Sequence, residues 1–145
     1  MTTYLHTMVR VSNIDESLRF YCDGLGLKEV RRKDVEKGRF TLIFLATPDD
    51  INIYKSPPQI ELTYNWDHED YSGGRNFGHL AFAVDNIYTT CLHLESMGIT
   101  ILRPPKDGRM AFIKSPDGIS VELLQKGDAL PLQDPWVTQK NQGSW

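Results

Sequence analysis

Two histidines and two glutamates recur in this sequence in a pattern that could hold a divalent metal ion. His6 and His79 each open a run of alternating residues, and Glu61 and Glu122 each lie within a later run of the same kind. Imidazole and carboxylate ligands without a thiolate suit Ni²⁺, Co²⁺, Zn²⁺ or Fe²⁺. Four protein ligands with room for water favour an octahedral site over a closed tetrahedral one. Taken singly, a His or Glu of this kind is usually just a partly exposed strand residue, so the case depends on what the four share.

What they share is an internal repeat. The segment HTMVRVSNIDESLRFYCDGLGLKEVRR from His6 can be aligned with HLAFAVDNIYTTCLHLESMGITILR from His79. At the same distance from each histidine an Asn is followed by Ile, then by a helix-like segment that ends at a Gly. Further on, IELTYN aligns with VELLQK, which brings Glu61 into line with Glu122. Two pairs of segments in the same order indicate duplicated modules.

Local signals divide each half into the same elements. Asn13 and Asn86 are typical helix N-caps, and Gly26 and Gly98 are typical helix ends. The alternating, turn-bounded stretches predicted as strands are 27–35, 39–46, 58–64, 99–103, 109–114 and 119–125. Each half is therefore predicted to be a βαβββ module. The predicted domains are residues 4–66, residues 77–126 and an extended tail over 127–145, where Trp136 and Trp145 indicate packing rather than a free end.

Strand alternation predicts that the four candidate ligands lie on corresponding faces. In each of the four strands the aliphatic side chains occupy one face, which suits packing under a helix, and the opposite face carries one His or Glu. Arg10 and Asn65 lie four residues beyond His6 and Glu61 on that same face, roughly 13 Å further along. A guanidinium and an amide there could bind the carboxylates of an extended anionic ligand. A surface salt bridge is the alternative for Arg10. His68 and His93 lie outside the repeat and are expected to be solvated.

Composition excludes several classes of function. The 145-residue chain has a net charge of −3, which gives no basic footprint for nucleic acid. No apolar run approaches the roughly 18 residues of a membrane span, and the N-terminus has no signal-peptide pattern. The two cysteines, Cys22 and Cys91, form no C-x-x-C pair, so a reducing cytoplasm is expected.

These motifs together resemble those of the glyoxalase I family in the vicinal-oxygen-chelate superfamily. The resemblance runs from Leu5 to about Lys126 and is carried by HTMVRV, SLRFYCDGLGL, IELTYNW, NFGHLAFAVDN and SPDGISVELL. It implies an α+β fold of two tandem βαβββ modules whose paired sheets form a cupped half-barrel, completed in a homodimer. It also implies that each active site lies at the subunit interface, with His6 and Glu61 of one subunit and His79 and Glu122 of the other holding one metal.

The resemblance further implies an activity and its residues. The activity is isomerisation of the methylglyoxal–glutathione hemithioacetal to S-lactoylglutathione through an enediolate, with Glu122 as the base and Glu61 serving the opposite diastereomer. Glutathione would be bound at Arg10, Asn65 and Arg75, and Arg103 and Arg109 occupy regions where basic residues also meet its glycyl or glutamyl carboxylate. The short loop between residues 46 and 59 favours Ni²⁺ or Co²⁺ over Zn²⁺. The DGRMAFI segment is shorter than in many members, which affects how the substrate is covered.

Other functions on the same fold are the alternatives. Extradiol dioxygenases and thiol transferases of this kind generally use three protein ligands, so the fourth, Glu61, argues against them. A metal-dependent epimerase shares the proton-transfer chemistry and is the nearest alternative. A binding module that sequesters a ligand or metal without turnover is the alternative from a different class.

Overall fold

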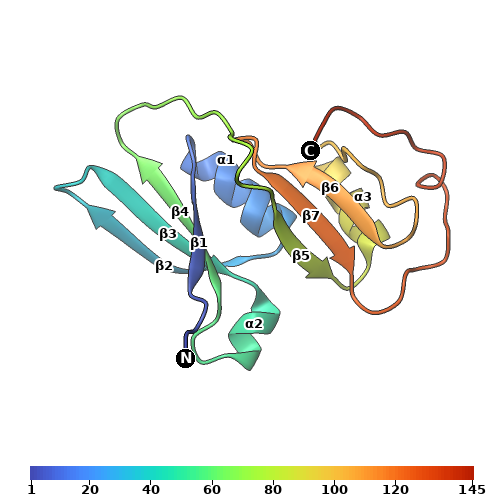
Figure 1. Cartoon of the computed structure of the whole chain (residues 1–145), viewed down its shortest axis with the longest axis horizontal. Helices are drawn as coiled ribbons and strands as arrows, with labels where there is room; N and C mark the ends of the chain where they lie inside the picture. The colour runs from blue at the N-terminus through green and yellow to red at the C-terminus, as the bar shows by residue number, and fades with distance from the viewer. The chain divides into compact units, whose positions relative to one another are not determined.

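The computed structural model describes all residues, 1–145, and divides them into two compact units, Met1–Tyr71 and Ser72–Trp145. Both units combine a small sheet with a helix (Figure 1), which confirms the α+β class. No helix in either unit is long and apolar enough to cross a membrane.

Unit 1 contains a four-stranded sheet in the order β1-β4-β3-β2. Its strands are β1 (His6–Arg10), β2 (Lys28–Val35), β3 (Phe40–Ala46) and β4 (Gln59–Asn65). Strand β1 pairs with β4 in parallel, while β2 with β3 and β3 with β4 are antiparallel. The edge strand β2 is almost wholly exposed, whereas β3 carries the buried residues Ile43, Phe44 and Leu45.

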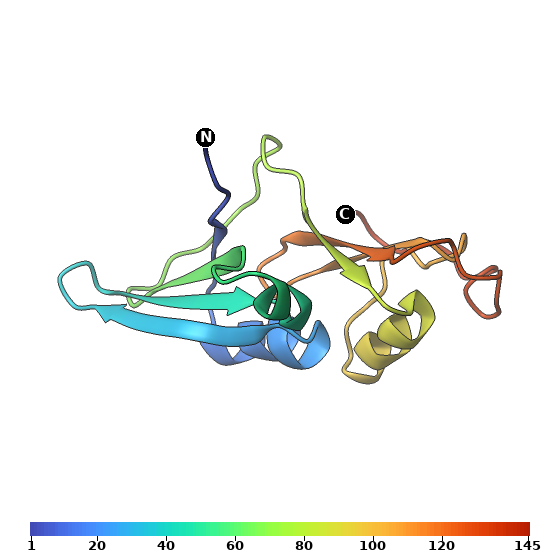
Figure 2. The ribbon, with the colours of Figure 1, turned by 90° about the horizontal axis from the view of Figure 1, so that it is seen from below.

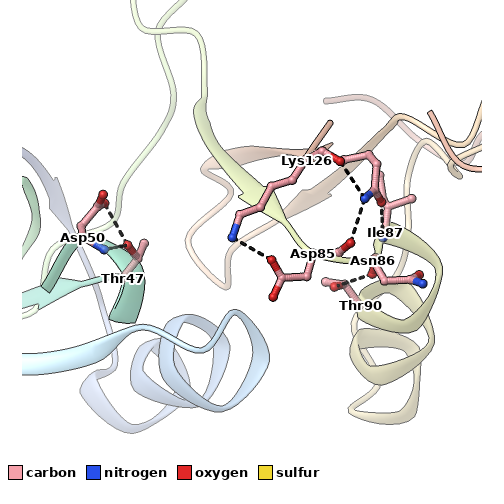
Figure 3. Close-up of polar contacts among 8 residues, drawn as sticks. Thr47, Asp50, Asp85, Asn86, Ile87, Thr90 and Lys126 are labelled. Atoms are coloured by element: carbon pink, nitrogen blue, oxygen red, sulfur yellow. Dashed lines mark hydrogen bonds and ion pairs between the residues drawn. The ribbon is translucent and has the colours of Figure 1, made fainter. Parts of the chain in front are cut away.

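The first helix of unit 1 begins where the sequence predicts and changes from an α-helix to a π-helix before it ends. Helix α1 (Ile14–Leu18) is capped by the Asn13 side chain, which accepts the backbone N–H of Glu16 at 2.9 Å. It continues as a π-helical turn, η1 (Arg19–Gly24), and the chain leaves it at Gly26, whose φ of 80° favours glycine. A further short helix, α2 (Pro48–Ile53), is capped by Thr47 (Figure 3) and was not predicted.

Unit 2 repeats this plan with a three-stranded sheet in the order β5-β7-β6. Its strands are β5 (Leu80–Val84), β6 (Met110–Lys114) and β7 (Ser120–Gln125), and β5 pairs with β7 in parallel. Helix α3 (Ile87–Ser96) begins at the Asn86 cap and lies on one face of this sheet (Figure 2). Gly98, with a φ of 82°, ends it as Gly26 ends the first helical segment.

The prediction of an additional strand over residues 99–103 in unit 2 is wrong. Only an isolated bridge between Arg103 and Phe112 remains of it. Pro104 and Pro105 follow at once and have no backbone N–H to donate to a ladder, so pairing cannot continue past Arg103. The second module therefore has three full strands where four were expected.

The tail after Lys126 packs within unit 2. Trp136 is fully buried and its ring stacks on Tyr88 at 6.3 Å between centroids. The Tyr88 hydroxyl donates to the Pro131 carbonyl at 2.8 Å, and the Leu130 N–H donates to the Gly108 carbonyl. The end of the chain returns to β6 (Figure 1), so the tail is an integral part of this unit.

Candidate metal-binding active site

The structure brings the candidate ligands together in two pairs, one in each unit. In unit 1 the His6 Nε2 atom lies 2.8 Å from a carboxylate oxygen of Glu61. In unit 2 the His79 Nε2 atom lies 3.7 Å from a carboxylate oxygen of Glu122. The histidine side chains are 39% and 43% exposed and the glutamates 12% and 16%, so each pair opens to solvent through its imidazole.

Strand register explains why each histidine meets its glutamate. Met8 lies directly opposite Glu61 in the parallel pair β1–β4, and His6 comes two residues earlier on the same face. Ala81 lies directly opposite Glu122 in β5–β7, and His79 again comes two residues earlier. Because side chains alternate along a strand, the same diagonal arrangement results in both units. The repeated sequence motif therefore gives the same His–Glu arrangement in both units.

Each pair fits a divalent cation by its donor chemistry. Two ligand atoms that each lie about 2.1 Å from one cation are separated by roughly 3 Å when they bind at a right angle. The observed separations of 2.8 and 3.7 Å lie on either side of this value. Two ligands are a partial coordination sphere, and no group of three or more such side chains comes together. Each unit thus brings together two of the four candidate ligands.

An aromatic ring supports each pair from the neighbouring strand. Phe44 lies directly opposite Glu61 in β3–β4, and its ring meets His6 edge to face at 6.1 Å. Phe112 lies directly opposite Glu122 in β6–β7, and its ring meets His79 edge to face at 5.3 Å. Neither ring was among the expected site residues, although Phe44 and Phe112 lie in stretches predicted as strands, 39–46 and 109–114.

A second feature of unit 1 is an open pocket of about 460 Å³ at the far end of β1 and β4. Arg10 lies opposite Thr63 in the β1–β4 ladder, so Arg10 and Asn65 repeat the diagonal arrangement of His6 and Glu61 four residues further along. The polar side chains that line the pocket are Arg10, Arg39, Asn65, Asp67, His68 and Glu69. Only Arg10 and Asn65 among these were expected from the sequence. Arg39 directly precedes β3, and Asp67, His68 and Glu69 follow shortly after the end of β4.

The pocket carries both signs of charge. Arg39 binds Asp67 through two hydrogen bonds of 2.9 Å, and these bonds hold the pKa of the Asp67 carboxyl below its usual value. Asn65 donates to the Tyr71 hydroxyl at 3.0 Å and lies 3.4 Å from a Glu69 carboxylate oxygen. Arg10 has no ion-pair partner, so its guanidinium is available to an anion. His68 is exposed, as expected, and pairs with Asp70.

The other arginines of the expected glutathione site are in unit 2. Arg75 is exposed in the segment before β5, and Arg109 is exposed directly before β6. The Arg103 side chain already has partners within unit 2. Its guanidinium donates to the Met110 carbonyl at 2.7 Å and lies 3.5 Å from an Asp107 carboxylate oxygen. Of these three, Arg103 is the least available to a ligand.

Comparison with known proteins identifies the class to which this fold and these residues belong. Residues 3–123 match the Glyoxalase/Bleomycin resistance protein/Dioxygenase superfamily. The chain belongs to this superfamily. The probable lactoylglutathione lyase of Synechocystis is 42% identical over 126 residues, covering 83% of this chain and 93% of the relative. The lactoylglutathione lyase of Neisseria meningitidis serogroup A is 42% identical over 127 residues, covering 84% and 89%.

Solved structures give the same family. The trypanothione-dependent glyoxalase I of Leishmania major superposes with a TM-score of 0.77 at 33% identity, covering 87% of this chain and 88% of that one. Glyoxalase I of Zea mays superposes with a TM-score of 0.74 at 34% identity, and this chain covers 45% of it. The match of residues 3–123 stops short of the tail that ends at Trp145.

Proposed function

We propose that this chain is a lactoylglutathione lyase, a glyoxalase I that isomerises the hemithioacetal of methylglyoxal and glutathione to S-lactoylglutathione. The observation that carries the proposal is the pair of His–Glu diagonals with identical register, His6 with Glu61 and His79 with Glu122. The similarity to lactoylglutathione lyases over most of both chains supports the same activity.

The four ligands His6, Glu61, His79 and Glu122 would hold one divalent metal, for which Ni²⁺ or Co²⁺ is favoured and Zn²⁺ is possible. When bound, such a metal supplies Lewis-acid polarisation of the two neighbouring oxygens of the substrate. Because each unit offers only two ligands, we propose a homodimer in which one site combines the unit 1 pair of one protomer with the unit 2 pair of its partner. The modules would then be residues 4–66 and 77–126, with the tail 127–145 attached to the second.

A carboxylate performs the proton transfer in this proposal. A Glu122 carboxylate oxygen accepts the proton from the carbon that bears the sulfur and delivers it to the neighbouring carbon. The hydroxyl proton passes between the two oxygens, so that the product thioester contains the same atoms as the substrate. Glu61 can perform the same transfer on the opposite diastereomer, since it holds the equivalent position in the first repeat.

The pocket of unit 1 supports glutathione as the thiol. The γ-glutamyl end of glutathione carries one carboxylate and one ammonium group. Arg10 and Asn65 can bind the carboxylate through charge-assisted hydrogen bonds, and Glu69 beside Asn65 can accept from the ammonium. Arg75, Arg103 and Arg109 remain candidates for the glycyl carboxylate. Both cysteines are free, which supports a reducing cytoplasm where glutathione is available.

Metal reconstitution tests this function. We expect metal-free protein to be inactive and to regain thioester formation from methylglyoxal and glutathione with Ni²⁺ or Co²⁺, followed by ultraviolet absorbance. Glu122→Gln should lower kcat about 10²- to 10⁴-fold while still binding metal, measured by calorimetry. Failure with every metal would refute the lyase. Full activity of Glu122→Gln would refute the assigned base, and activity with Zn²⁺ alone would refute the metal preference.

An epimerase is the second candidate because it would use the same carboxylates. The mixed-charge pocket argues for glutathione, since an epimerase substrate need not carry a zwitterionic end. Turnover of the hemithioacetal in the reconstitution assay separates the two candidates.

A further inference from the structure

The last residue of the chain, Trp145, lies on the face of the unit 2 sheet that carries the His79–Glu122 pair. Its ring stacks on Phe112 with 5.8 Å between centroids and 22° between planes. Phe112 is the direct cross-strand partner of Glu122, and its ring edge meets His79. Cross-strand partners project from the same face of a sheet. The tail therefore ends on the face that bears the candidate ligands.

Contacts along the tail hold Trp145 in this place. The Leu130 N–H donates to the Gly108 carbonyl, and a side chain at position 108 would collide with the Leu130 carbonyl. The buried Trp136 forms the middle anchor. The Gln142 N–H donates to the Leu102 carbonyl at 2.8 Å, close to the chain end. These contacts, at Leu130, Trp136 and Gln142, fix the course of the tail up to Trp145.

The exposure of Trp145 indicates a role beyond filling the interior. Trp145 is 41% exposed although Phe112 beneath it is only 7% exposed, and Trp136 in the same tail is fully buried. One face of the Trp145 ring thus covers Phe112 while much of the rest stays open. Exposed aromatic surface next to a polar site is typical of a ligand-contacting wall.

We propose that Trp145, supported from beneath by Phe112, forms an aromatic wall that contacts the apolar substituent contributed by the 2-oxoaldehyde, so that the tail selects among these substrates. The proposal rests on the proposed lyase function. The reacting carbons must lie by His79 and Glu122, and their substituent extends from there along the sheet face. A methyl group ends close to the reacting carbons, whereas an aryl group extends further and can stack on the open part of the Trp145 ring.

The first test compares two hemithioacetals, one from methylglyoxal and one from phenylglyoxal, in steady-state assays. We expect Trp145→Ala to lower kcat/KM for the aryl substrate about three- to tenfold and for methylglyoxal less than about twofold. Trp145→Phe should restore most of the aryl preference because it retains a stacking ring. Leu132→Ala is the matched control, since Leu132 is an exposed apolar residue of the same tail. That control should leave the substrate ratio unchanged.

The second test needs no turnover and keeps the two proposals separable. Calorimetry with S-benzylglutathione and S-methylglutathione should show that Trp145→Ala weakens binding of the benzyl ligand alone. Equal affinities and an unchanged substrate ratio in Trp145→Ala, with or without a lower Tm, would overturn the wall and leave a structural role only. Wild-type protein that binds the benzyl ligand through Trp145 but never forms thioester would instead overturn the lyase and keep the wall.

Discussion

Unit 1 and unit 2 share the His–Glu diagonal but differ four residues further along the same strands. Unit 1 places Arg10 and Asn65 there, at the edge of the mixed-charge pocket. Unit 2 has Ala83 in place of the arginine and Lys126 in place of the asparagine, and the Lys126 ammonium is paired with Asp85 at 2.8 Å (Figure 3). The His–Glu pair is thus common to both units, while a basic side chain without an ion-pair partner at this position occurs in unit 1 alone.

The two units also differ in what covers the aromatic ring beside each pair. In unit 1 the Arg31 guanidinium lies over the Phe44 ring at 3.9 Å. Arg103 holds the same ladder position opposite Phe112 in unit 2, but its side chain turns to Met110 and Asp107, and Trp145 covers the ring instead. A cation in one unit and an indole in the other give the two faces different chemistry.

The largest effect is expected from two variants that each damage one of the two His–Glu pairs, tested alone and as a mixture. His6→Ala and His79→Ala should each lose more than about 100-fold of the activity, because each removes a ligand from every site. Mixed and re-equilibrated, the two variants should regain activity, since a heterodimer would contain one site made from two intact pairs. Specific activity and metal content of the mixture, compared with each variant alone, measure this.

The control for this mixture is a pair of variants damaged in the same unit, His6→Ala with Glu61→Ala. Every site formed by these two chains contains a damaged unit 1 pair, so no recovery is expected. Recovery in this control, or none from His6→Ala with His79→Ala when mixed dimers are detected by mass spectrometry, would contradict the shared site.

Much of this arrangement could be predicted from the sequence because it depends on local periodicity. Alternation in VELLQK and IELTYN places Glu122 and Glu61 opposite the buried aliphatic side chains, and the structure buries Val121, Leu123 and Leu62 accordingly. The Asn13 and Asn86 caps follow from side-chain chemistry alone. The repeat then predicts that whatever holds for one half holds for the other.

What the sequence could not predict depends on pairing between distant segments. The register that places His6 diagonal to Glu61 comes from the parallel β1–β4 ladder, and no local pattern encodes it. The strand expected over 99–103 looked alternating, but the prolines after it removed the donors that a ladder needs. The place of Trp145 depends on a chain of contacts through the tail, of which the sequence indicated only that aromatic residues should pack.

The difference in anion binding predicts an asymmetric response to removing cations. Arg10→Ala should raise the KM for the glutathione hemithioacetal about 10- to 100-fold with little change in kcat, because a hydrogen bond to a charged group is lost. Arg10→Lys should recover part of the loss, since lysine keeps the charge but not the fork of donors. Steady-state kinetics at constant ionic strength measure both.

Lys126→Ala is the matched control from the corresponding end of unit 2. Its ammonium pairs with Asp85, so its loss should change stability slightly and leave KM within about twofold. A rise in KM equal to that of Arg10→Ala would show that both units bind the anionic ends of the substrate, so that the two units would not differ in this respect.

The smallest effect concerns Asp107, which accepts two backbone N–H groups in the turn before β6 and pairs with Arg103. Burial alone would raise the pKa of this carboxyl, but bonds from the Arg109 and Met110 N–H groups, together with Arg103, outweigh it, and the pKa is lowered. A carboxyl with a lowered pKa stabilises the fold above its unfolded pKa, and that stability is lost as the pH falls through the folded pKa. Asp107→Ala should therefore cost about 1 kcal/mol at pH 7.

Urea unfolding of wild type and Asp107→Ala at pH 7 and in acid measures this difference. The ion pair with Arg103 should contribute little, because the Asp107 side chain is 46% exposed and solvent screens it. The destabilisation should shrink in acid, where the wild-type carboxyl is protonated as well. Asp128→Ala, at an exposed position of the same unit, is the control and should change neither value. A difference that stays the same from pH 7 into acid would show that side-chain packing, rather than the ionised carboxylate, makes this turn of unit 2 stable.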